Sequence, residues 1–238
     1  LSIGLGAALL AVLPLSPNIY IARSDVSLLI PFAIIGFTPL VILIAAWASS
    51  NKFAFIGGLR ALHQLIAYEI PMLISVLGIV ILSGSLDLMI IVESQQQVWF
   101  IIPQLLGAII FYITILSELE RTPFDIPEAE TELVSGWLTE YTGMHFGLLQ
   151  LGLYMKFYAL SLLFTLLFLG GWYGPAFLPP LAWLLIKLFF VITVVILPRA
   201  VMPRLRIDQL MRLGWVWLIA LSFINLFIAV IEVSLGLI

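Results

Sequence analysis

The chain has 238 residues, of which 63% are hydrophobic and 10% are charged, with a formal net charge of −3. Soluble domains average about 45 to 50% apolar and 25% charged residues, and the mean hydropathy here is +1.21. No soluble core can bury so much apolar surface, so lipid is expected to cover it, with the backbone polar groups paired inside helices. Cysteine is absent, which excludes disulfides, thiolate iron-sulfur ligation and cysteine zinc sites. No cofactor is therefore expected on this chain alone, and no nucleic-acid partner is expected.

Stretches of about 20 apolar residues are long enough to cross the hydrocarbon core of a bilayer. The sequence contains seven, the first cut short, and no internal repeat of span length is apparent. It therefore predicts an all-α integral membrane protein with about seven transmembrane helices in a single domain over residues 1–238. The predicted spans are 1–15, 26–48, 59–82, 98–116, 146–169, 177–197 and 214–235.

Basic residues gather on one side of the predicted bundle, in the loops after the second, fourth and sixth spans. The opposite loops contain only Arg23. By the positive-inside rule the basic side is predicted to be cytoplasmic, which places an acidic loop at 117–145 on that side. The basic residues there are Lys52, Arg60, Arg121, Arg199, Arg204, Arg206 and Arg212.

Three ionisable residues stand out because they lie inside predicted spans and away from the span ends: Glu69, Lys156 and Lys187. A charge at mid-span costs about 2.5 to 3.5 kcal/mol on insertion scales, so each residue is a functional candidate. The structural alternative for Glu69 is a hydrogen-bonded seam between helices. For the two lysines it is a buried ion pair with carboxylates.

A polar stripe precedes Glu69 on the same predicted helix. Arg60, Gln64 and Tyr68 follow one another at intervals of four residues, so they share one helix face. Glu69 lies nine residues after Arg60, roughly 13 Å along the axis at about 1.5 Å per residue. The stripe is predicted to lead from the basic side toward a buried Glu69.

The loop after the fourth span holds seven of the thirteen acidic residues. Asp125 and Glu128 have the spacing of a capping box. Glu128 and Glu132 share a helix face while Glu130 points elsewhere, and repulsion between such carboxylates favours proton uptake where water is scarce. Coupled carboxylates of this kind are suited to passing protons. A solvated acidic loop is the alternative.

Three blocks of this sequence resemble the membrane H-subunit (subunit 1) family of complex I type NADH-quinone oxidoreductases, which is shared with group 4 membrane-bound nickel-iron hydrogenases. The strongest block is 118–143, which contains Pro-Phe-Asp, Pro-Glu-Ala-Glu, Glu-Leu-Val and Thr-Glu-Tyr. The second block is 47–71 and the third is 170–215. Together they cover most of the chain.

The resemblance implies a subunit that joins the peripheral redox arm to the membrane arm, contributes to a quinone chamber and starts the proton path. It implies as partners the iron-sulfur and large peripheral subunits, antiporter-like and small membrane subunits, and membrane lipid. Iron-sulfur clusters are expected in those partners, and quinone at the interface with them. The implied location is a prokaryotic plasma membrane, or an organellar inner or thylakoid membrane. The proton-path positions are Glu69, Glu118, Glu128, Glu130 and Glu132, to which we add Glu140 and Lys156; loop or interface positions are Arg60, Arg121, Asp125, Arg204, Arg206 and Asp208.

Two departures from the family pattern stand out. Relatives begin with a further transmembrane helix and an amphipathic helix, for which this sequence shows no counterpart. Many relatives also have a Glu-Tyr pair where this chain has Leu153-Tyr154. One carboxylate of the path is then missing, and Lys156, one turn further, is the predicted substitute.

Other interpretations of the sequence remain open. The chain is alternatively the membrane anchor of a group 4 energy-converting hydrogenase or a related ferredoxin-linked complex. A stand-alone secondary ion transporter would show two related halves, which are not apparent. His63 and His145 are the only histidines that a haem could use. The acids can also act as a structural anchor for a basic partner surface. The sequence does not identify the electron donor or the electron acceptor, nor whether the complex translocates protons or sodium ions.

Overall fold

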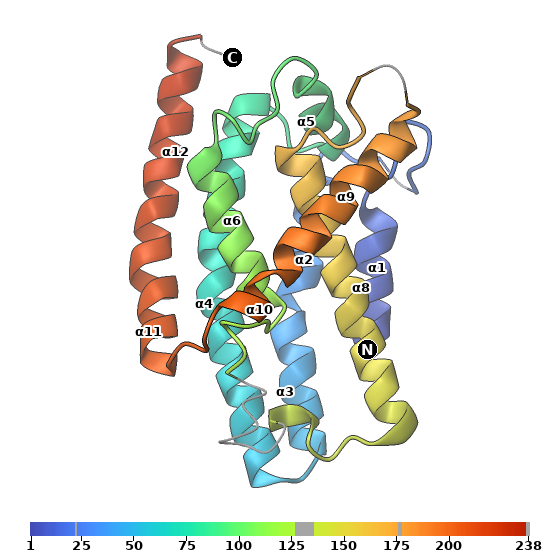
Figure 1. The fold of residues 1–238 in the computed structure, drawn as a ribbon, viewed down its shortest axis with the longest axis vertical. Coiled ribbons are helices and arrows are strands. Elements are labelled where there is room, and N and C mark those ends of the chain that lie inside the picture. Colours follow the sequence, from blue (N-terminus) through green and yellow to red (C-terminus); the bar gives the residue numbers. More distant parts are fainter. Residues whose placement is uncertain (22, 127–135, 176–177, 237–238) are drawn as a thin grey trace.

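A computed structural model describes residues 1–21, 23–126, 136–175 and 178–236 (Figure 1). These residues form helices joined by loops, and no β-strand occurs among them. The α-helices are α1 (Ser2–Val12), α2 (Leu29–Gly36), α3 (Thr38–Ala48), α4 (Lys52–Ser83), α5 (Leu88–Ser94), α6 (Leu105–Glu118), α8 (Gly143–Phe168), α9 (Pro180–Ile196), α10 (Pro198–Val201), α11 (Ile207–Arg212) and α12 (Ile219–Ser234). A 3-10 helix spans Gly136–Leu138, and a π-helix spans Leu213–Leu218.

Five helical segments are long and apolar enough to cross a membrane, and two further apolar helices, α1 and α6, are shorter. Each corresponds to one predicted span, so the prediction of an all-α integral membrane protein is confirmed. The five long segments are Leu29–Ala48, Lys52–Ser83, Gly143–Phe168, Pro180–Val201 and Ile207–Ser234.

Several boundaries differ from the prediction. The second span is interrupted at Phe37, between α2 and α3, because Pro39 at the start of α3 has no N–H to donate to the preceding turn. The predicted span 98–116 corresponds to α6, which begins only at Leu105. Pro103 disfavours the helical conformation of the residue before it, so the helix starts after this proline. Helix α5 was not predicted. It starts at Leu88 and is capped by Asp87, whose carboxylate accepts a hydrogen bond from the Met89 N–H at 3.0 Å.

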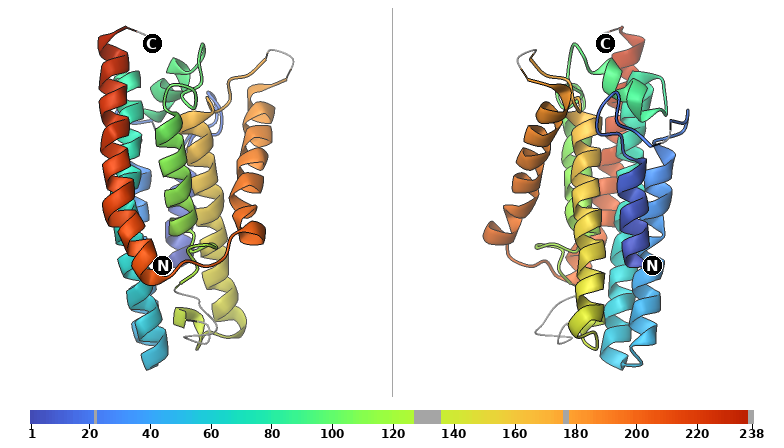
Figure 2. Two further views of the ribbon diagram at one scale, coloured as in Figure 1. Left: turned by 60° about the vertical axis from the view of Figure 1, so that its left-hand side comes forward. Right: turned by 90° about the vertical axis from the view of Figure 1, so that its right-hand side faces the viewer.

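Helix α4 runs through the middle of the bundle and packs against α3, α6 and α12, while α1 packs against α8 (Figures 1 and 2). Phe32, Phe111, Phe164 and Phe168 form the aromatic centre of the core, with Phe164 and Phe168 centroids 5.1 Å apart. Helix α9 runs obliquely across α8 and leans away from the bundle (Figure 2). Residues of α6, α8 and α9 line a groove on this flank.

Lys187 on α9 has a structural role that the sequence did not indicate. Its buried ammonium donates to the backbone carbonyls of Leu169 at 2.6 Å, Gly171 at 3.2 Å and Tyr173 at 2.5 Å. It also lies 4.3 Å from the centre of the Trp99 ring. These carbonyls follow the end of α8, where the helix dipole attracts a cation. Among the described residues the ammonium binds backbone carbonyls and not the carboxylate that the structural alternative had proposed, so Lys187 fixes the turn after α8.

Candidate functional site

A buried ion pair joins the end of α6 to the middle of α8. The Lys156 ammonium lies 2.8 Å from Glu118 Oε2 and 2.9 Å from the Glu118 carbonyl oxygen. The side chains of Lys156 and Glu118 are 6% and 1% exposed, respectively. Glu118 is the last residue of α6, so Lys156 also neutralises the negative end of that helix. Two buried charges of this kind require each other, because removing one leaves the other without compensation.

Glu69 lies near the middle of α4, close to this pair. It is half-buried, and the charges of both Glu118 and Lys156 act on it. Its carboxylate rests against Gly36, where a Cβ would be only 2.6 Å from Glu69 Oε1. Gly36 ends α2 at the helix interruption. Three ionisable side chains from α4, α6 and α8 are thus brought together within the membrane-spanning part of the fold.

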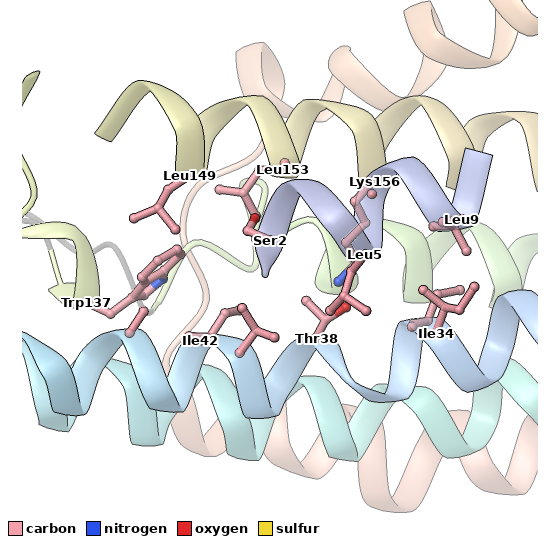
Figure 3. A pocket seen from close by; sticks show the side chains of 15 residues that line it. Ser2, Leu5, Leu9, Ile34, Thr38, Ile42, Trp137, Leu149, Leu153 and Lys156 are labelled. Carbon is pink, nitrogen blue, oxygen red and sulfur yellow. The ribbon is translucent and has the colours of Figure 1, made fainter. Parts of the chain in front are cut away.

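A narrow cavity lies beside Lys156, between α1, α2, α3 and α8 (Figure 3). Its volume is about 30 Å³, which has room for water, since a water molecule needs roughly 10 to 15 Å³. A cavity that binds a benzene ring is about 150 Å³, so this one does not fit a quinone ring. The labelled side chains in Figure 3 are Ser2, Leu5, Leu9, Ile34, Thr38, Ile42, Trp137, Leu149, Leu153 and Lys156.

The predicted polar stripe on α4 binds the start of the acidic loop. The Gln64 amide donates to the carbonyls of Ser117 at 3.0 Å and Phe124 at 2.9 Å. The Tyr68 hydroxyl donates to the Leu210 carbonyl at 2.9 Å, and its ring meets Phe124 edge to face. Gln64 and Tyr68 are fully buried, whereas Arg60 at the start of the stripe is half-buried. Gln64 and Tyr68 therefore hold the segment after Glu118 against α4.

The other acids of the loop lie in different environments. Glu120 is buried and its Oε2 accepts from Trp137 Nε1 at 3.3 Å. Glu140 is exposed and accepts from Asn51 Nδ2 at 2.6 Å. Glu120 is a buried acid that sequence reasoning did not select, although its place beside Glu118 could have drawn attention to it. The predicted path residues Glu128, Glu130 and Glu132 lie outside the described residues.

The predicted interface residues occupy the basic end of the bundle. Asp125 pairs with Arg204 at 3.0 Å, and the helix that Asp125 was predicted to cap lies outside the described residues. Arg206 and Asp208 are exposed at the start of α11. Arg121 is half-buried and stacks on aromatic rings of α8.

Leu153 lines the cavity one turn before Lys156 (Figure 3). A carboxylate at residue 153 would therefore project toward the same space. Leu153 and Lys156 therefore line the same cavity. Sequence reasoning missed Gly36, whose only signal is its position three residues before Pro39.

Comparisons with known proteins agree on one family. A family profile described as NADH dehydrogenase matches residues 1–230. The chain is 43% identical over 231 residues to the H-subunit of NADH-quinone oxidoreductase from Brevibacillus brevis, covering 95% of this chain and 69% of that relative. It is 44% identical over 222 residues to the corresponding protein of Anoxybacillus flavithermus and 46% identical over 222 residues to that of Bacillus cytotoxicus, covering 92% of this chain and 67% of each relative. The chain therefore belongs to the H-subunit family of NADH-quinone oxidoreductases.

Proposed function

We propose that this chain connects the peripheral redox arm to the membrane arm of a proton-translocating complex I type NADH-quinone oxidoreductase, and that it contains the start of a proton path. The family membership supports the first part, since the relatives are named as subunits of that enzyme. The second part is carried by one observation, the buried pair of Glu118 and Lys156 beside Glu69. The other subunits of the complex are the partners.

The pair supports a simple relay. Charges a few ångströms apart in a medium of low dielectric interact by several kcal/mol. A change of charge in a docked redox partner would act on the loop that begins at Glu118. A proton taken up by Glu118 weakens its attraction for Lys156, and the ammonium is then attracted more strongly to Glu69. In this proposal, water in the cavity next to Lys156 carries the proton between the helices.

The acidic loop provides the docking side of this proposal, on the cytoplasmic or equivalent face. Its start is fixed against α4 by Gln64 and against the segment before α11 by the pair of Asp125 and Arg204. Glu128, Glu130 and Glu132 extend the proposed path toward that face. Quinone enters the proposal only as a substrate held between this chain and its partners, because the cavity beside Lys156 is too small for its ring.

Replacing Glu69 by Gln tests the relay. The variant keeps the size of the side chain but cannot carry a negative charge, so we expect the complex to assemble and its ratio of protons moved to electrons transferred to fall well below the wild-type ratio. The measurement is proton uptake by vesicles containing the purified complex. Glu93, an exposed acid near the end of α5, provides the matched Gln control. A wild-type ratio for Glu69→Gln would refute the role of this residue in the path.

A further inference from the structure

Helix α12 packs along α4 and also contacts α6 (Figure 1). Its buried face carries Ser222, Asn225 and Ala229, which follow one another at intervals of three and four residues and so lie on one side of the helix. Asn225 is only 1% exposed. It lies nine residues before Ser234, the last residue of α12, or about 13 Å along the axis at about 1.5 Å per residue. A side-chain amide is therefore buried in the part of α12 that crosses the apolar layer.

The amide of Asn225 rests against two glycines. A Cβ at Gly107 on α6 would lie 2.8 Å from Asn225 Nδ2, and a Cβ at Gly78 on α4 would lie 2.9 Å from the same atom. A Cβ does not approach other atoms so closely, so the amide fits between α4 and α6 because both positions lack a side chain. In membrane proteins small residues let helix backbones approach, and Asn or Gln side chains form hydrogen bonds across them.

Gln104, the residue before α6, forms a polar cluster with Asn225 and Glu232. It is fully buried, and its Nε2 donates to Glu232 Oε2 at 3.0 Å. This bond orients the Gln104 amide, so that its Oε1 faces Gly78, whose Cβ would lie 2.8 Å from it. Since Gln104 Oε1 is an acceptor, the atom of Asn225 that belongs beside it is the donor Nδ2. The orientation of both amides is thereby defined.

Three buried atoms of this cluster have no hydrogen-bond partner among the described residues, namely Gln104 Oε1, Asn225 Nδ2 and Asn225 Oδ1. Unpaired amide groups are costly where lipid surrounds the protein, and buried polar side-chain atoms are nearly always paired. A direct bond from Asn225 Nδ2 to Gln104 Oε1 would still leave Asn225 Oδ1 unpaired. Both Gln104 Oε1 and Asn225 Nδ2 lie within 2.9 Å of one point, the Cβ position of Gly78. A single water molecule, with hydrogen bonds of about 2.7 to 3.2 Å, can therefore span them.

We propose that this cluster is a binding site for buried water, which bridges Gln104 Oε1 and Asn225 Nδ2 and so joins α12 to the start of α6. Buried waters make about three hydrogen bonds to polar groups that otherwise lack a partner. A sodium ion fits less well, because hard cations take oxygen ligands, whereas the Asn225 atom beside Gln104 is a donor. The line of donors then runs from Asn225 through water and Gln104 to Glu232. The proposal does not depend on the proton path, since no residue of the Glu118 site takes part.

The test is a cryo-electron-microscopy map of the intact wild-type complex at a resolution that shows ordered water. We expect a water peak within hydrogen-bonding distance of both Gln104 Oε1 and Asn225 Nδ2. The peak should remain when choline replaces sodium and potassium throughout the purification. A wild-type map without the peak would overturn the proposal, including a map in which the two amides bond directly. Loss of the peak in choline would indicate a bound metal cation and would overturn it as well.

Asn225→Leu tests whether this residue holds the water. The change keeps the size of the side chain and removes its polar atoms, so we expect the peak to disappear and the Tm of this chain within the complex to fall, because Gln104 Oε1 is left without a donor.

Ser222→Ala is the matched control for Asn225→Leu. Ser222 is buried one turn away on the same helix, and its hydroxyl donates to the Ile219 carbonyl of that helix at 2.8 Å. This variant should keep the peak. A peak that remains in Asn225→Leu, or that is lost equally in both variants, would overturn the assignment of the water to Asn225. The wild-type map decides the proposal even if Asn225→Leu does not assemble.

Discussion

Replacing Glu118 by Leu is expected to lower the stability of the protein by about 3 to 5 kcal/mol, the usual cost of leaving one member of a buried ion pair alone. Lys156→Met should have a similar effect, because the Glu118 carboxylate then loses its counter-charge at 2.8 Å. The double variant Glu118→Leu/Lys156→Met should be more stable than either single variant, since apolar side chains in place of a whole buried pair are often neutral or stabilising. Thermal unfolding of this chain within the purified complex ranks the stability of the wild type, the two single variants and the double variant.

The pair of Asp125 and Arg204 is the internal control for this cycle. Its side chains are 17% and 43% exposed, and exposed pairs contribute about 0 to 1 kcal/mol. Arg204→Met should therefore have little effect in the same assay. If the Glu118→Leu/Lys156→Met double variant is destabilised by the sum of its single changes, the two residues do not act as a pair.

Placing a methyl group at Gly36 is expected to displace the Glu69 carboxylate and to reduce proton translocation strongly. The added Cβ would lie 2.6 Å from Glu69 Oε1, closer than two such atoms approach. The long Glu69 side chain can yield by leaving its rotamer, at a cost of about 0.5 to 1.5 kcal/mol. Gly36→Ala should consequently assemble and remain folded, while the ratio of protons to electrons falls.

Gly147→Ala is the matched control, because a Cβ at Gly147 on α8 meets no atom within 4 Å. It should leave both assembly and the proton ratio unchanged. A normal ratio in Gly36→Ala would mean that the position of the Glu69 carboxylate does not matter for translocation.

Hydropathy was sufficient to predict the class of fold, because each long apolar segment must be a helix when lipid surrounds it. It could not predict the interruption at Phe37 or helix α5, which depend on single residues. Pro39 removes one backbone donor, and Asp87 supplies one cap. Such local effects leave the mean hydropathy of a segment unchanged.

The candidate site was predicted as a set of residues and not as an arrangement. Lys156 and Lys187 look alike in sequence, as single lysines within apolar spans. The first pairs with Glu118, 38 residues away along the chain, while the second binds backbone carbonyls. Which acceptor each ammonium reaches depends on how α6, α8 and α9 pack, and this is set by contacts distant in sequence. The role of Gln64 in holding the loop could not be predicted either, because the carbonyls that it binds are distant in sequence.

The central claim is that the buried Glu118 carboxylate takes part in proton translocation. The most direct test is the ratio of protons translocated to electrons transferred by the reconstituted complex containing Glu118→Gln, with Glu93→Gln measured in parallel. The Gln variant cannot exchange a proton, but it keeps an oxygen acceptor near Lys156 and leaves Glu69 as the nearby counter-charge, so its loss of stability should be smaller than that of Glu118→Leu. We predict an assembled complex whose ratio is far below that of the Glu93→Gln control. A ratio equal to the control would contradict the claim.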